Sequence, residues 1–322
     1  MFDTWILSAT NRLVWKCISH FVDKRTLKGR MIRSRRVKRR MPRAKLRDAI
    51  RHALAIFEHF DPETEALFLG SSHTVYGIAP EVFQSVRAWN AGYNSGDFKI
   101  AYYTYQAVRQ QWPKRPGQAV VISDDFWMVS HQIEFTPEFY QAVLVSHFTG
   151  MPYESDFLIG VHHRYVGRKI VRYRGKGLSE QILNARGFIA GLAATAKENR
   201  PGVTEARVKG HCKRAHFQPE GLKYLKALMD LVSEDGREIV FLRFPVREDY
   251  LAALDALQDD VWAPGDSLRA GKPLLDCFRM PFPQTYWADA DHFTEEGARA
   301  FSAWLEPKLQ ALLQTFRQQG CK

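Results

Sequence analysis

The sequence predicts an α/β domain built on a mostly parallel sheet. Short apolar runs that fit buried strands alternate along the chain with longer segments of helical periodicity. The strand candidates are residues 66–69, 119–122 and 238–244. Strands that alternate with long helices imply crossover connections and therefore parallel pairing. Sheets of this kind place their active sites at the carboxyl ends of the strands, so the residues that follow each strand are the first candidates for chemistry.

Helical periodicity accounts for most of the chain between and after these strands. It covers residues 43–60, 98–112, 136–147, 179–199, 219–233, 247–258 and 294–316. Asp61-Pro62 ends the first of these helices, because a proline cannot continue it. Residues 150–215 are rich in arginine and lysine, and we interpret them as an excursion from an α/β domain that covers residues 48–322.

Residues 1–47 form a separate amphipathic and basic segment. Apolar side chains recur at helical spacing through residues 1–22, and residues 24–47 then contain thirteen lysines or arginines and no acid. Subtracting these thirteen charges from the formal net charge of +11 leaves −2 for the rest of the chain. This pattern favours an in-plane anchor on an anionic membrane surface. The alternatives are a helix packed on the domain with a solvated linker, or a nucleic-acid contact, which no recognisable nucleic-acid module supports.

Composition narrows the class of protein further. Apolar residues make up 45% of the 322 residues and aromatic residues 13%, which suits a large folded domain. No run of apolar residues is long enough to span a membrane, and the N-terminus does not resemble a signal peptide. We therefore expect a cytoplasmic protein that binds peripherally at the inner membrane face. The four cysteines form no CxxC pair, so we expect no disulfide framework and no metal or other cofactor.

The first chemical candidate is Ser72, which follows the strand at residues 66–69 and the turn residues Gly70 and Ser71. A serine in this position can present its hydroxyl to a cleft at the end of a sheet. Its weak nucleophilicity requires a neighbouring base. Gly-Ser-Ser also occurs in ordinary turns, so this stretch needs support from elsewhere in the chain.

That support comes from Asp289 and His292, which lie just before the last predicted helix. A catalytic histidine needs a carboxylate to hold its tautomer and stabilise its imidazolium form, and the spacing Asp-x-x-His lets one turn supply both groups. Thr294 can cap the following helix. We expect Asp289 to reach Nδ1 of His292, and Asp291 to face solvent or cap the helix. The alternative, in which both acids are only turn and cap residues, does not explain a histidine immediately before the cap.

Residues 89–97, Trp-Asn-Ala-Gly-Tyr-Asn-Ser-Gly-Asp, form a third candidate. A glycine-rich loop before a helix exposes backbone N–H groups that could stabilise an oxyanion. The alternative is a plain connection between a strand and a helix.

In combination these stretches resemble the SGNH, or GDSL, hydrolase superfamily. Residues 70–72 are similar to its first block, with Ser71 where an aspartate is usual; residues 90–97 resemble its second block, and residues 289–292 its last, Asp-x-x-His. The likeness spans residues 64–312 and is nearest to the branch that holds the D-alanine transfer protein of teichoic acid synthesis and the alginate O-acetylation proteins. Residues 77–80, Gly-Ile-Ala-Pro, and the run from Trp287 to Ala298 support that branch. The resemblance implies a three-layer α/β/α sandwich of flavodoxin-like arrangement.

The resemblance also assigns roles. Ser72 becomes the nucleophile, His292 the base and Asp289 the residue that orients it. The backbone N–H groups of Ser72 and Gly96 become the oxyanion donors, with Gly92 as the alternative to Gly96. Asn94, in the same loop, becomes a candidate for substrate binding.

The third block departs from the family pattern at Asp125. The superfamily has Gly-x-Asn-Asp there, and its asparagine donates to the oxyanion, but residues 122–126 read Ile-Ser-Asp-Asp-Phe. An ionised carboxylate cannot donate a hydrogen bond. Losing one such donor commonly costs about 10²–10³ in rate. Either another donor serves, or Asp125 is protonated, or the protein is a weak or specialised catalyst.

The resulting hypothesis is a serine-dependent esterase or O-acyltransferase that moves an acyl group, by preference acetyl, from or to a carbohydrate. The polymer-modifying relatives suggest a cell-surface glycan or its precursor as the partner. The alternative is a catalytically weak or inactive protein of the same fold that binds or scaffolds polysaccharide assembly.

Overall fold

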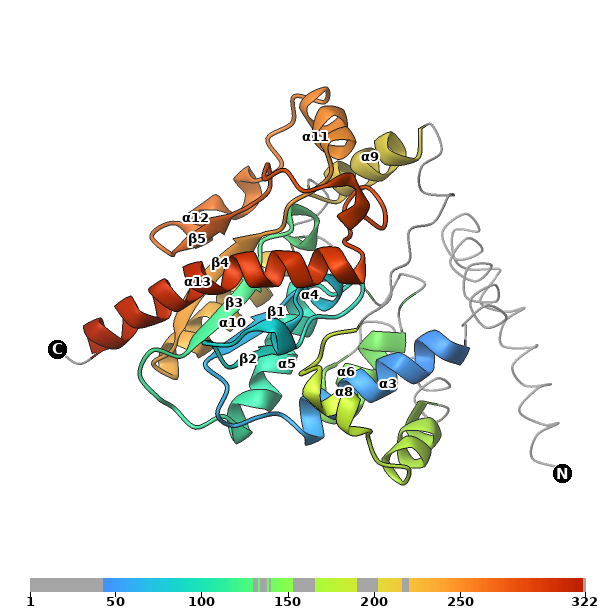
Figure 1. Ribbon diagram of the computed structural model, residues 1–322, viewed down its shortest axis with the longest axis vertical. Coiled ribbons are helices and arrows are strands. Elements are labelled where there is room, and N and C mark those ends of the chain that lie inside the picture. The colour runs from blue at the N-terminus through green and yellow to red at the C-terminus, as the bar shows by residue number, and fades with distance from the viewer. Residues whose placement is uncertain are drawn as a thin grey trace, which may run out of the picture. The chain divides into compact units, whose positions relative to one another are not determined.

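The computed structural model describes residues 43–129, 133, 138, 140–152, 166–189, 202–215 and 220–320 (Figure 1). The chain divides into two compact units, Met1–Leu46 and Arg47–Lys322, and the account below concerns the second. The expectations for residues 1–42 lie outside the described residues. Among the residues described, no helix combines the length and the apolar character needed to cross a bilayer.

A five-stranded, fully parallel sheet forms the centre of this unit, as the α/β prediction requires. Its order is β2-β1-β3-β4-β5, and each neighbouring pair is parallel. The strands are β1 Ala66–Leu69, β2 Ala88–Asn90, β3 Ala119–Ser123, β4 Glu238–Arg243 and β5 Leu274–Asp276. The sequence predicted β1, β3 and β4 but neither outer strand. Those two have only three residues each, and β5 is largely exposed, so neither has the apolar run that marks a buried strand.

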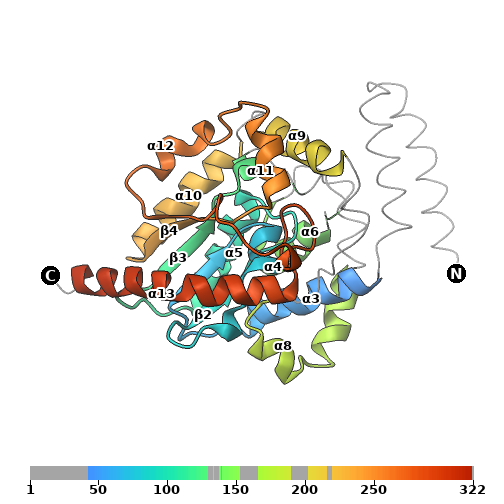
Figure 2. The same cartoon turned by 45° about the horizontal axis from the view of Figure 1, so that its top comes forward.

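Both faces of the sheet are covered, which gives three layers. Alternate residues of β1 enter different cores: Leu67 and Leu69 pack on one side, Ala66 and Phe68 on the other. The first core is completed by α5, Phe98–Val108, and α10, Gly221–Glu234. The second is completed by the long C-terminal helix α13, Glu295–Gly320. Figure 2 shows α13 crossing one face of the strands while α5 and α10 lie beyond the other.

Further helices surround this centre. They are α3 Arg43–Glu58, α4 Ser72–Gly77, α6 Tyr140–Thr149, α8 Glu180–Asn184, α9 Val203–Ala215, α11 Glu248–Asp255 and α12 Asp266–Arg269, with one more helix over residues 166–174. Part of the predicted excursion belongs to the core, because Val208 and Cys212 of α9 are buried in the first cluster.

The helix predicted over residues 179–199 is wrong in its extent. Within residues 179–189, α8, Glu180–Asn184, is the helical part, and residues 190–199 lie outside the described part of the chain. The carbonyl of Arg186 accepts a hydrogen bond from Asn90 N–H of β2 at 2.9 Å, so the chain is drawn to the open edge of the sheet. Gly187 follows with φ of 88°, and a Cβ there would lie 1.8 Å from the Asn90 carbonyl oxygen. The helix therefore ends before this point, because Arg186 pairs with the edge strand and Gly187 adopts a backbone conformation that does not fit a helix.

Candidate active site

Ser72 begins α4 at the carboxyl edge of the sheet, where parallel sheets place their sites. Ser71 is the N-cap, and its hydroxyl accepts the backbone N–H of His73 at 3.2 Å. Gly70 makes the turn sharp enough, since a Cβ at this position would lie 2.3 Å from Cβ of Ser123. The Gly-Ser-Ser sequence thus turns β1 directly into a helix whose first residue is Ser72.

Asp289 organises the turn that presents His292. Its Oδ1 accepts the backbone N–H of Asp291 at 3.0 Å and that of His292 at 2.8 Å. Helix α13 then begins, and the Thr294 hydroxyl accepts the N–H of Gly297 at 3.2 Å, which is the cap that the sequence predicts. These hydrogen bonds all lie within residues 289–297, so the turn does not depend on contacts with the rest of the protein.

The structure brings Ser72, His292 and Asp289 together across 220 residues of sequence. Nε2 of His292 lies 2.8 Å from Oγ of Ser72. Nδ1 of His292 lies 3.0 Å from both carboxylate oxygens of Asp289. Hydroxyl, imidazole and carboxylate are therefore joined in the order that a serine nucleophile, its base and the orienting acid require.

Asp291 is not at the surface, and the expectation that it faces solvent or caps α13 is wrong. Its side chain is 1% exposed. One oxygen pairs with Arg207 of α9 and lies 3.4 Å from Nδ1 of His292, while the other lies 3.5 Å from Nε2 of His73. Burial is tolerable because these cations compensate the carboxylate. Asp289 also contacts Arg207, at 2.8 Å, so one guanidinium serves both acids.

Asp125 is an acceptor in the interior and does not act as an oxyanion donor. It receives hydrogen bonds from Nδ1 of His73 at 2.8 Å, from the hydroxyl of Ser123 at 2.7 Å and from the hydroxyl of Ser71. Burial alone would raise the pKa of Asp125, but the charge and hydrogen bond of His73 hold it below its usual value. The three hydrogen bonds that Asp125 accepts and its lowered pKa favour the ionised carboxylate among the three alternatives for this departure.

The loop of residues 90–97 satisfies its own backbone. The N–H of Gly92 donates to Oδ1 of Asn90 at 3.0 Å, and the N–H of Gly96 donates to the carbonyl of Tyr93 at 2.7 Å. Neither group is available as the oxyanion donor that the sequence predicted. Asn94 is half-buried in this loop and is not among the residues that line the hollow at Ser72. Among the described residues, no acceptor takes the N–H of Ser72, the other predicted donor.

Burial and charge shift the pKa values of the site in opposite directions. Burial alone would lower the pKa of His292, but Asp291 and Asp289 raise it to about 10. Burial would likewise lower the pKa of His73, which Asp125 raises to about 9. The pKa values of Asp289 and Asp291 would be raised by burial and are instead lowered, first by the charge of His292.

Three described residues could together hold a metal ion: His73, Asp291 and His292 offer ligand atoms within 4.8 Å of one another. Two contacts argue against that use. Arg207 already supplies a positive charge to Asp291, and both nitrogens of His292 already face Ser72 and Asp289. The chemistry of this donor set fits proton transfer better than metal binding.

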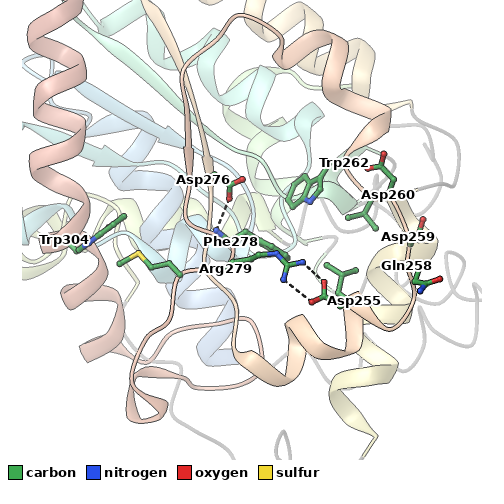
Figure 3. Close-up of a pocket in the computed structure, with 12 residues that line it drawn as sticks. Asp255, Gln258, Asp259, Asp260, Trp262, Asp276, Phe278, Arg279 and Trp304 are labelled. Atoms are coloured by element: carbon green, nitrogen blue, oxygen red, sulfur yellow. Dashed lines mark hydrogen bonds and ion pairs between the residues drawn. The ribbon is translucent and has the colours of Figure 1, made fainter.

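The described residues enclose only about 10 Å³ beside Ser72, room for about one water molecule. A larger hollow of about 740 Å³ lies near β5 and is shown in Figure 3. Carboxylates and aromatic rings line it, among them Asp255, Asp260, Asp276, Trp262 and Trp304. Neither Ser72 nor His292 lines this hollow, so it is separate from the candidate site.

Sequence reasoning missed the contributions of His73 and Arg207. His73 directly follows Ser72, so its position next to the nucleophile was visible, but a single histidine gave no reason to expect burial against two carboxylates. Arg207 lies in the segment interpreted as an excursion, and nothing in its sequence neighbourhood links it to residues 289–292.

Comparisons with known proteins add little to this geometry. No family model matches the chain, and the search of curated proteins found no match. A Streptococcus pneumonia structure provisionally described as a platelet activating factor superposes with a TM-score of 0.37 at 15% identity, over 83% of this chain and 92% of its own. A Bacteroides fragilis structure provisionally described as an acylhydrolase gives 0.36 at 13%, over 79% and 90%. Superpositions this loose carry no weight for fold or activity.

Proposed function

We propose that this protein is a serine-dependent acyl esterase or O-acyltransferase of SGNH type. The observation that carries the proposal is the continuous chain of hydrogen bonds from Ser72 through His292 to Asp289. Two short sequence motifs, which are separated by most of the domain, predict this arrangement.

The mechanism follows from these contacts. Oγ of Ser72 attacks the acyl carbonyl carbon while Nε2 of His292 takes the hydroxyl proton. The tetrahedral intermediate collapses, the bond to the leaving alcohol breaks, and His292 returns the proton to that alcohol. Water or a sugar hydroxyl then attacks the acyl-serine and loses its proton to His292. The bond between the acyl carbon and Oγ breaks, and His292 returns the proton to Oγ of Ser72. Asp289 holds the imidazole and stabilises its charged form.

The site has few hydrogen-bond donors for the oxyanion of the tetrahedral intermediate. The N–H of Ser72 is the one predicted donor still available, because those of Gly92 and Gly96 are used within their loop. Missing donors cost about 10²–10³ in rate each. This observation favours the second candidate function, a catalytically weak member of the fold that binds or scaffolds a polysaccharide assembly.

A carbohydrate is the acceptor or substrate that we favour. The likeness of residues 64–312 to the glycan-modifying branch suggests it. Acetyl is the acyl group that this branch would supply.

Labelling with a fluorophosphonate tests the reaction class. We expect covalent modification on the peptide that contains Ser72, loss of modification in Ser72→Ala, and no change in Ser233→Ala, which removes an exposed hydroxyl on α10. Hydrolysis of p-nitrophenyl acetate with and without an oligosaccharide then separates an esterase from a transferase. A folded wild-type protein that stays unlabelled would favour the scaffold instead.

We also propose that residues 1–47 bind an anionic membrane surface. Each cation near such a surface contributes about 1 kcal/mol before screening. Co-sedimentation with vesicles should therefore require anionic lipid and weaken as salt rises. A chain without residues 1–47 should stay in the supernatant. Equal binding to neutral and anionic vesicles would end this proposal.

A further inference from the structure

A second histidine–aspartate pair lies directly behind the Ser72 site. His73 is fully enclosed, with its side chain 2% exposed, and Nδ1 donates to Asp125 at 2.8 Å. Its ring stands edge-on to that of His292, with 5.1 Å between the centroids, and edge-on to Trp127 at 4.9 Å. The side chain after the nucleophile thus points into the protein, toward the back of the catalytic histidine.

The far nitrogen of His73 faces Asp291. Nε2 is buried, lacks a hydrogen-bond partner of normal length among the described residues, and lies 3.5 Å from Oδ2 of Asp291. The other oxygen of Asp291 lies 3.4 Å from Nδ1 of His292. One carboxylate therefore stands between the two imidazoles, and its position and effective charge depend on both.

The charges around this point require a cation at His73. The buried carboxylates of Asp125, Asp289 and Asp291 converge here, and Arg207 reaches only the last two. An isolated buried carboxylate is costly unless it is paired. A neutral His73 can donate from only one of its two nitrogens, so either Asp125 or Asp291 would face a lone pair of the ring. An imidazolium donates to Asp125 at one nitrogen and attracts Asp291 at the other.

We propose that His73 is a positioning residue for the reaction at Ser72: held by Asp125 as an imidazolium, it fixes the Asp291 carboxylate against His292 and offsets part of its charge. This inference rests on the proposed function. It assigns His73 no contact with substrate, because both of its nitrogens face carboxylates. Its effect on catalysis passes through Asp291 to the basicity and orientation of His292.

Other titratable or charged groups also face this network from the elements packed around it. They are Asp289 and Arg207, His211 of α9, whose pKa is lowered to about 3, and Tyr250 of α11, whose hydroxyl bonds His211 at 2.7 Å. Arg247 also interacts with Asp289. Arg207 and Arg247 therefore supply fixed positive charge among the described residues around the network, and both are present in every variant below.

The experiment is an NMR pH titration of the His292 ring nitrogens in the full chain, which reports basicity whether or not turnover occurs. Asp291→Asn should lower the pKa of His292, and His73→Gln should raise it, each by about one pH unit or more for charges this close. The shift in the double variant should differ from the sum of the two single shifts, because the effect of His73 passes through Asp291 in addition to the direct repulsion between the two rings.

Two further variants keep the test decisive. Asp125→Asn removes the anion that keeps His73 charged, so it should raise the pKa of His292 as His73→Gln does, even if one of the two folds poorly. His52→Gln removes another buried histidine, which bonds the Gly92 carbonyl at 2.6 Å and has a pKa lowered to about 4. It should leave the His292 titration unchanged.

An unmoved His292 titration in folded His73→Gln and Asp125→Asn would overturn the inference and leave His73 a purely structural residue. Additive shifts in the double variant would also overturn it, since His73 would then act on His292 directly. Fluorophosphonate labelling separates the two proposals. If Ser72 is labelled and the His292 titration does not move, only the role of His73 is contradicted. If the titration shifts but Ser72 is not labelled, only the proposed enzymatic activity is contradicted.

Discussion

Two histidine–aspartate pairs lie side by side in this protein, and they differ in what the second nitrogen of each ring meets. In the pair of His292 and Asp289, the far nitrogen faces the hydroxyl of Ser72, and both side chains retain some exposure, 16% and 13%. In the pair of His73 and Asp125, the far nitrogen faces the carboxylate of Asp291, and the exposures are 2% and 3%. The same two residue types thus form two pairs that differ in burial and in the group that the far nitrogen meets, a hydroxyl in one pair and a carboxylate in the other.

The largest expected effect separates the two aspartates. Asp289→Asn should reduce ester hydrolysis by about 10⁴, because the orienting acid holds the tautomer in which Nε2 can accept a proton. Asp125→Asn should reduce it by about tenfold or less, since Asp125 acts at a distance through His73. Steady-state kinetics with p-nitrophenyl acetate measures both. A similar loss in the two variants would mean that the pairs are not distinct in role.

A smaller effect concerns the cation that joins the buried acids. Arg207→Ala should lower the free energy of unfolding by on the order of 3 kcal/mol, because Asp291 stays buried with one partner fewer. Arg279→Ala is the matched control: its ion pair with Asp255, drawn in Figure 3, has side chains 64% and 52% exposed. That loss should be about 0–1 kcal/mol. Urea denaturation of the two variants gives the ranking, and equal losses would contradict the burial argument.

The pH dependence of labelling sharpens the comparison further. His292 must be neutral to take the proton of Ser72, and its pKa is raised from 6.5 to about 10. The rate of fluorophosphonate labelling should therefore rise about tenfold per pH unit above neutrality and level off near that pKa. A rate already level at pH 7 would show that His292 titrates normally.

The protons on His292 and His73 also affect stability: as pH rises, the labelling rate should increase while the free energy of unfolding decreases. Because the folded protein holds protons on His292 and His73 more tightly than the unfolded chain does, their contribution is complete below about pH 6.5. It is lost as pH rises through about 9 to 10. The urea midpoint should fall over that range while the labelling rate climbs.

Local rules predicted much of the fold. Apolar runs gave β1, β3 and β4, and helical periodicity gave α5, α10 and α13 nearly to their observed ends. Prediction failed where pairing between distant segments overrode a local pattern. The helix after Ser179 stops because Arg186 bonds the edge strand β2, and β2 itself is too short to show an apolar run.

For the candidate site, the sequence by itself determined the two turns that present Ser72 and His292, because Gly-Ser-Ser after a strand and Asp-x-x-His before a helix depend on neighbours within a few residues. Only the tertiary structure decided which polar groups were left unsatisfied by those neighbours. The N–H groups of Gly92 and Gly96 are consumed inside their own loop. Asp291 can be buried because its carboxylate is paired with Arg207, which lies on a helix 84 residues earlier in the chain. The charge of a buried group depends on the side chains around it, and these come from segments that are far apart in the sequence. Local sequence patterns therefore cannot predict it.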